Sequence, residues 1–154
     1  HAARGGPVRR VADDVAFPNG MAVTPDNRTL IVADSYRHCL VGFDIGTDGG
    51  LSNRRVWADL GDGVPDGICV DADDAVWYAD VPHKRCVRVA EGGTVRQTVE
   101  LDRGAFACIL GGLDGTSLFV TAAEWRGMTE AEMVTPRSGQ VLVTDVDVPA
   151  AGWP

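Results

Sequence analysis

The stretch FPNGMAV at residues 17–23 returns 47 residues later as VPDGICV at residues 64–70, and this repetition decides the fold. In both copies a turn rich in Asp and Asn follows, and then an apolar segment that ends in Ala-Asp, at residues 30–34 and 76–80. A basic loop and a segment that begins with Cys come next, and a weaker third copy starts near Ala107. A period of 41–47 residues with about four strands in each unit is typical of the blades of a β-propeller.

The composition agrees with an all-β protein made of many short strands. The 154 residues include 19 Gly and 8 Pro, which are spread along the whole chain. No stretch of about 12 residues shows clean helical periodicity, apart from a short candidate at residues 129–133. The Asp-Gly and Asp-Asn pairs suit tight hairpins because Gly, Asn and Asp tolerate positive φ angles.

The strand pattern predicts four-stranded antiparallel blades at approximately residues 13–60, 61–104 and 105–148. Residues 7–12 are predicted as an outer strand of the preceding or closing blade. The expected strands are enough for three blades, whereas closed propellers have about four to eight, and unclosed ends would leave sheet edges exposed. The single domain at residues 1–154 is therefore predicted to be half of a six-bladed propeller. A second chain, a second copy or a portion that was cut away would complete it.

Net charge and hydropathy argue against two classes of partner. Lys and Arg total 14 and Asp and Glu total 22, which gives a formal net charge of −8. Nucleic acids and anionic membranes both need a basic protein face, so neither is expected as the main partner. No apolar run approaches the roughly 18 residues of a transmembrane helix. The start at residues 1–7 lacks a Met and is no signal peptide, so we expect a trimmed chain or a fragment.

The four cysteines, Cys39, Cys69, Cys86 and Cys108, lie far apart and form no C-x-x-C pair. Their spacing is not that of a zinc ribbon. We expect buried free thiols within strands, although the even count leaves a disulfide open and the sequence alone cannot pair the residues. Reduced thiols favour a cytoplasmic location.

Three ordered motifs resemble the family of gluconolactonase, regucalcin (senescence marker protein) and luciferin-regenerating enzyme. They are PNGMAV at residues 18–23, PDGICVD at residues 65–71, and Gly111-Gly112 followed by LFVTA at residues 118–122. A lone P-D-G would be an ordinary turn, but the resemblance runs in the right order and spacing over residues 7–154. The family fold is a longer, six-bladed propeller, and this chain resembles its C-terminal half. The resemblance therefore implies that an N-terminal half is missing.

The resemblance also implies a metal site. The family carries one divalent cation at the top of its central channel, held by a Glu of the first blade, the Asn of P-N-G and the Asp of P-D-G. The last two correspond to Asn19 and Asp66, whereas the Glu has no counterpart in this chain. Calcium is the preferred ion, with Zn²⁺, Mg²⁺ and Mn²⁺ as alternatives.

The placement of Asn19 and Asp66 agrees with that role. They occupy equivalent positions just before the inner strands of adjacent blades, so they would converge on the propeller axis. Amide and carboxylate oxygens are hard ligands that suit Ca²⁺, Mg²⁺ or Mn²⁺. In the third copy Ala107 stands at this position, and an Ala cannot bind a metal. The alternative for both residues is a turn residue paired with the Gly that follows it.

Two functions of different classes follow. The first is a metal-dependent lactonase or related esterase, in which the metal polarises the carbonyl of a small-molecule lactone or ester and activates water. Asp66 would be the catalytic residue that binds the metal and accepts a proton, while Asn19 would supply an oxygen. This chain alone would be inactive if half of its site is missing. The alternative is a non-catalytic propeller that binds calcium or another protein, because the fold alone does not choose.

Several other acidic residues are interpreted structurally. Asp34 and Asp80 stand at equivalent strand ends and are expected to cap turns and loops. The DADD segment at residues 71–74 faintly resembles a calcium loop, but it lacks the Gly and the distal Glu of an EF-hand. A solvated hairpin turn is expected there.

Four loop residues are minor candidates for the chemistry. His38 and His83 follow the second strands of their blades, where acid–base work on an ester is conceivable. Trp125 and Arg126 follow the second strand of the third blade and could contact substrate. The stretch at residues 81–85 departs from the Gly-rich loop of the family, which leaves the substrate open.

Overall fold

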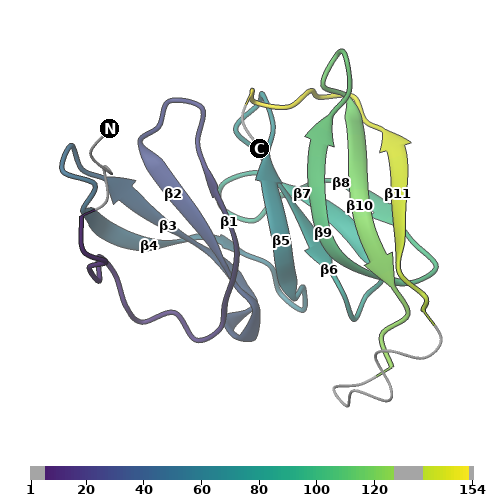
Figure 1. Ribbon diagram of the computed structural model, residues 1–154, viewed down its shortest axis with the longest axis horizontal. Helices are drawn as coiled ribbons and strands as arrows, with labels where there is room; N and C mark the ends of the chain where they lie inside the picture. The colour runs from purple at the N-terminus through teal and green to yellow at the C-terminus, as the bar shows by residue number, and fades with distance from the viewer. Residues whose placement is uncertain (1–5, 127–136, 153–154) are drawn as a thin grey trace.

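The chain is all-β, as predicted (Figure 1). The computed structural model describes residues 6–126 and 137–152, so the helix expected at 129–133 lies outside the described residues. The described residues form eleven strands and one short 3-10 helix, and no helix among them has the length and apolar character needed to cross a membrane. The elements are β1 (Pro18–Val23), β2 (Thr29–Asp34), η1 (Ser35–Arg37), β3 (Cys39–Ile45), β4 (Leu51–Asp59), β5 (Pro65–Val70), β6 (Val76–Asp80), β7 (Arg85–Val89), β8 (Val95–Glu100), β9 (Gly104–Gly111), β10 (Ser117–Ala123) and β11 (Gln140–Asp145).

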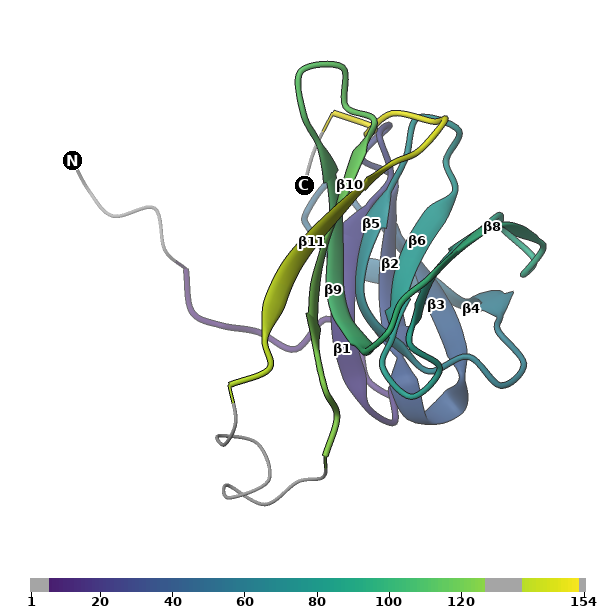
Figure 2. The same cartoon turned by 90° about the vertical axis from the view of Figure 1, so that its right-hand side faces the viewer.

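The strands form three antiparallel sheets, each a meander of consecutive strands. The first two sheets have the orders β1-β2-β3-β4 and β5-β6-β7-β8. The third has the order β9-β10-β11, so it contains three strands in the described part of the chain. The first strand of each sheet packs against the first strand of the next, β1 against β5 and β5 against β9, and the sheets lie in succession (Figures 1 and 2).

Hairpin turns connect the first two strands of the first two sheets, at the places where the sequence carries Asp and Asn. Asn27, between β1 and β2, has a φ of 61°, and Asp74, between β5 and β6, has a φ of 59°. These left-handed conformations are open to Asn and Asp at low cost. The backbone hydrogen bond from Asn27 N to Thr24 O (2.8 Å) and that from Asp74 N to Asp71 O (3.1 Å) close the two turns. The repeated turn chemistry therefore gives repeated hairpins.

Successive side chains along the strands of the second sheet point to opposite faces and belong to two separate hydrophobic cores. Ile68 and Tyr78 face the first sheet, where they join a cluster that contains Ile31 and Trp57. The neighbouring side chains on the same strands, such as Trp77, face the third sheet and join a second cluster. That cluster contains Cys69, Ala79, Cys86, Ala105, Cys108, Leu110, Leu118 and Val120. Because the second sheet is covered on both faces, every residue of β6 is buried.

Two glycines allow the inner strands to approach closely. A Cβ added at Gly20 would lie 2.6 Å from the carbonyl oxygen of Asp66. A Cβ added at Gly67 would lie 2.7 Å from Cα of Ala107. Such distances are far inside van der Waals contact, so a residue without a side chain is needed at both positions. The Gly that follows Asn19 and Asp66 thus serves the packing between sheets.

Residues 7–12, predicted as an outer strand, form no strand in the described part of the chain. Ala12 and Val15 pack on the far face of the first sheet, against Cys39, Val41 and Phe43. Arg9 donates a hydrogen bond to the carbonyl oxygen of Asp48 (2.7 Å), and Asp14 pairs with Arg37 (2.7 Å). These contacts fasten the segment to the first sheet.

Candidate functional site

The same irregularity occurs in the first strand of all three sheets. On β1 two residues lie between the paired positions Pro18 and Met21, while only one lies between their partners Asp34 and Val32 on β2. β5 repeats this β-bulge between Pro65 and Ile68, and β9 repeats it where β10 passes from Thr121 to Ala122. A bulge turns the side chain of its extra residue in a new direction and is frequent beside functional sites.

The predicted site residues Asn19 and Asp66 both lie in these bulges, and the structure brings them together. The backbone of Gly20 abuts that of Asp66, and the Asn19 side chain lies close enough to affect the Asp66 carboxyl. Burial raises the pKa of Asp66, and the neighbouring Asn19 side chain opposes that rise only in part. The pair therefore presents a partly buried carboxylate beside an exposed amide.

Ser35 ties the two bulges to each other. Its hydroxyl donates a hydrogen bond to the carbonyl oxygen of Pro65 (2.6 Å), which belongs to the second sheet. Nδ2 of Asn19 lies 3.5 Å from the same hydroxyl oxygen. Ser35 follows directly after β2 and is itself buried. One buried hydroxyl therefore links the Asn19 amide to the backbone of Pro65, the residue that precedes Asp66.

Two buried aspartates hold the chain just before each bulge. Asp34 accepts hydrogen bonds from the backbone N–H groups of Ala16 (2.9 Å) and Phe17 (3.0 Å). Asp80, at the equivalent place, accepts one from Val64 (3.4 Å). Both side chains are fully buried. The interpretation of these residues as loop caps is confirmed, and the loops that they cap lead into Asn19 and Asp66.

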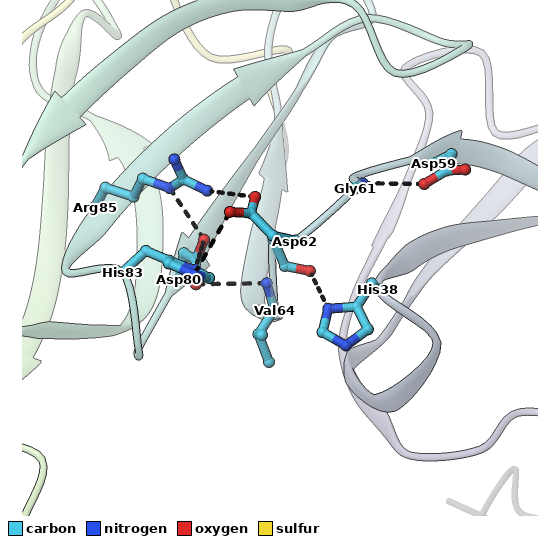
Figure 3. A network of polar contacts seen from close by, with 9 residues as sticks. His38, Asp59, Gly61, Asp62, Val64, Asp80, His83 and Arg85 are labelled. Carbon is cyan, nitrogen blue, oxygen red and sulfur yellow. Dashed lines mark hydrogen bonds and ion pairs between the residues drawn. The ribbon is translucent and has the colours of Figure 1, made fainter.

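Asp80 also contacts one of the two candidate histidines, His83 (Figure 3). His83 Nδ1 lies 2.8 Å from Oδ1 of Asp80, and its Nε2 lies 3.8 Å from the exposed carboxylate of Asp62. Arg85 bridges the same two carboxylates at 3.1 and 3.3 Å. His38 Nδ1 lies 3.0 Å from the carbonyl oxygen of Gly63. Both histidines thus fasten neighbouring loops to residues 60–64, the segment that enters the second bulge.

The register corrects one sequence assignment. Met21, Ile68 and Cys108 occupy equivalent positions, because they pair with corresponding residues of the second strands. The residue two positions earlier, equivalent to Asn19 and Asp66, is therefore Phe106 and not Ala107. The sequence analysis therefore aligned the third copy of the repeat one residue too far along the chain. Ala107 is equivalent to Gly67, and its small side chain was a signal for this alignment. Phe106 stands beside Trp125, with ring centroids 6.0 Å apart.

The remaining candidates have structural partners. Asp71 is buried, accepts hydrogen bonds from the backbone of Asp73 and Ala75, and pairs with Arg88, so the segment is a hairpin turn as expected. Arg126 pairs with Glu124. All four cysteines are free and buried, as expected, and Cys108 contacts Cys69 and Cys86 in the core.

The donor set fits a hard divalent cation but does not complete its shell. Asn19 and Asp66 offer an amide and a carboxylate oxygen, whereas Ca²⁺ takes about 6–8 oxygen ligands. Among the residues that the structure describes, no three His, Cys, Asp or Glu side chains are grouped to hold a metal. Any cation held here needs ligands beyond this pair.

Sequence comparison places the chain in a known family. Residues 1–124 match the SMP-30/Gluconolactonase/LRE-like region. The chain is 33% identical to regucalcin of Danio rerio, over 86% of this chain and 46% of the relative. It is 30% identical to 6-deoxy-6-sulfogluconolactonase of Pseudomonas putida, over 94% of this chain and 51% of the relative. It therefore spans about half the length of these relatives.

Solved structures agree on the fold. Regucalcin from Agrobacterium tumefaciens, described as a calcium-binding protein, superposes with a TM-score of 0.77 at 22% identity, over 94% of this chain and 51% of that chain. A gluconolactonase from Xanthomonas campestris gives a TM-score of 0.66 at 30% identity, over 77% of this chain and 38% of that chain. With the family match over residues 1–124, these likenesses lead to one conclusion: the chain belongs to the SMP-30/gluconolactonase/LRE-like family.

Proposed function

We propose that this chain is part of a metal-dependent lactonase, in which Asn19 and Asp66 hold one divalent cation, with Ca²⁺ preferred. The observation that carries the proposal is the meeting of these two side chains at equivalent bulges of adjacent inner strands. A cation would bind the Asp66 carboxylate in its charged form, offsetting the effect of burial on the pKa of that group. The Asn19 carbonyl oxygen would provide a second ligand.

The reaction class comes from relatives whose names include gluconolactonase and 6-deoxy-6-sulfogluconolactonase. When bound, a cation supplies Lewis acidity for an ester carbonyl and lowers the pKa of a bound water. Asp66 would then orient that water and accept its proton. Ser35 would keep the bulges of both strands in place through Pro65 and Asn19. The free thiols support a reducing compartment, such as the cytoplasm.

The proposal includes a completed ring. The outward face of the third sheet carries exposed apolar side chains, namely Ile109, Phe119, Val141 and Val143. At the other end of the stack, Met21 and Val23 of β1 are also exposed. Such surfaces are unfavourable in water. We propose that residues 1–154 form three blades, at about 13–60, 61–104 and 105–148, of a six-bladed propeller. The missing N-terminal half completes it, or failing that a second copy.

A non-catalytic role is the second candidate. One structural neighbour is described as a calcium-binding protein, and two ligand residues alone suit ion binding as well as catalysis. In that case the ion would bind at Asn19 and Asp66 but no ester would be cleaved. Both functions require the bound metal, but only the lactonase would turn over a substrate.

The test uses the full-length protein, assayed on a panel of lactones with and without a chelator. Calcium binding is measured in parallel by isothermal titration calorimetry. Asp66→Asn should abolish metal-dependent hydrolysis and weaken calcium binding, while Asp13→Asn, an exposed aspartate on the opposite side of the first sheet, should leave both unchanged. Calcium binding without any hydrolysis would select the non-catalytic function, and normal activity in Asp66→Asn would overturn the assignment of the site.

A further inference from the structure

The third inner strand breaks the polar pattern of the first two. At the bulge where β1 carries Asn19 and β5 carries Asp66, β9 carries Phe106. The strands touch at this level, because a Cβ on Gly67 would lie 3.0 Å from the carbonyl oxygen of Phe106. The aromatic ring therefore belongs to the same row of bulged residues as the proposed metal ligands.

Phe106 lies in an apolar setting that opens to solvent. Its ring is tilted against that of Trp125, which is 47% exposed. A half-buried ring paired with an exposed one has the character of a ligand-binding wall, because apolar groups dominate small-molecule sites.

The opposite edge of the row is aromatic too. Phe17, two residues before Asn19, stacks on Tyr36 with ring centroids 4.4 Å apart. Both rings are substantially exposed. Tyr36 directly follows Ser35, the residue that ties the two bulges together. The pair of polar ligands thus lies between two aromatic pairs, one from the first sheet and one from the third.

We propose that Phe106 and Trp125 form an apolar wall of the site, and that the substrate is a lactone or ester with an aromatic or aliphatic substituent. This rests on the proposed lactonase function, which it deepens by naming the substrate class. The reacting carbonyl would lie at Asn19 and Asp66, and the substituent would pack on Phe106. A fully hydroxylated lactone gains little from such a wall, because its hydroxyl groups would lose water without finding hydrogen-bond partners.

The experiment compares γ-phenyl-γ-butyrolactone with unsubstituted γ-butyrolactone on the full-length protein and on Phe106→Thr. The control is Leu113→Thr, which removes a fully exposed apolar side chain from the turn between β9 and β10. Wild type should prefer the phenyl lactone. Phe106→Thr should lower kcat/KM for it by about tenfold or more, as expected for losing one buried ring contact. The unsubstituted lactone should be unaffected, and Leu113→Thr should change neither rate.

Binding of 3-phenylcyclopentanone, a non-hydrolysable analogue, is followed by saturation-transfer NMR and provides a readout without turnover. If neither lactone is hydrolysed but the ketone binds to wild type and not to Phe106→Thr, the lactonase proposal fails. The proposal that Phe106 forms an apolar wall of a binding site is then still supported. If Phe106→Thr slows both lactones equally, or only lowers the melting temperature, the ring packs against the rest of the protein and the wall is wrong. A wild-type preference for the unsubstituted lactone would also overturn it.

Discussion

Gly20 lies so close to Asp66 that a methyl group at position 20 would stand 2.6 Å from the carbonyl oxygen of Asp66. The contact fixes the distance between the two inner strands that carry Asn19 and Asp66. In the Asn-Gly and Asp-Gly pairs of the repeat, the first residue is the proposed metal ligand and the second lets the strands meet.

Gly20→Ala should therefore destabilise the fold by about 1–3 kcal/mol, the usual cost of overpacking a close contact. The midpoint of urea unfolding measures this. Gly139→Ala is the matched control, because a Cβ there meets nothing within 4 Å, and it should change stability by less than about 1 kcal/mol. Equal effects of the two substitutions would show that the strands do not approach as described.

Asp80→Ala should destabilise the protein by about 3–5 kcal/mol, as is usual when one partner of a buried ion pair is removed. The substitution leaves Arg85 and His83 with only the exposed carboxylate of Asp62, and the backbone N–H of Val64 without its acceptor. Asp13→Ala serves as the control for loss of an exposed carboxylate. Chemical denaturation gives the stabilities, and a loss near zero for Asp80→Ala would contradict the role of Asp80 as the loop anchor.

Tyr78 should make stability depend on pH in the alkaline range. Burial raises its pKa to about 12 from the usual 10.0, and the nearby Asp80 adds to the effect. Between these values the unfolded chain ionises Tyr78 and the folded protein does not. The contribution of Tyr78 is therefore complete below pH 10 and is lost as the pH rises toward 12.

Urea unfolding at several values between pH 9 and pH 12 measures this dependence. The variant Tyr78→Phe should show a shallower decline than wild type over that range, because the other alkaline groups remain. Absorbance at 295 nm should show one ionisation step fewer near pH 12 in the variant. Identical pH profiles for the two proteins would contradict the burial of the Tyr78 hydroxyl.

The isolated chain should associate in solution through the open face of the third sheet. Val141 and Val143 are 73% and 60% exposed on β11, beside Phe119. Val143→Lys should shift the sedimentation coefficient toward that of a monomer, because a charge at a buried apolar contact is costly. Val95→Lys, at an exposed Val of the outer strand β8, should leave association unchanged. A compact wild-type monomer would count against the incomplete ring.

The sequence by itself determined what depends on neighbours along the chain. The turns that contain Asn27 and Asp74 could be predicted, since turn geometry is set by a few consecutive residues. The repeat also placed Asn19 and Asp66 at equivalent positions, and the register agrees. The family could be recognised from ordered motifs for the same reason, because each motif is a local segment.

Only the tertiary structure decided what depends on contacts between sheets. Every residue of β6 is buried because sheets pack on both of its faces, which the pattern along the strand does not show. Residues 7–12 form no strand in the described chain, and of these only Ala12 packs on the first sheet. The identity of Phe106 as the third bulged residue rests on a one-residue register set by the approach of Gly67 to Ala107. Contacts of this kind join segments about 40 residues apart, and no local pattern encodes them.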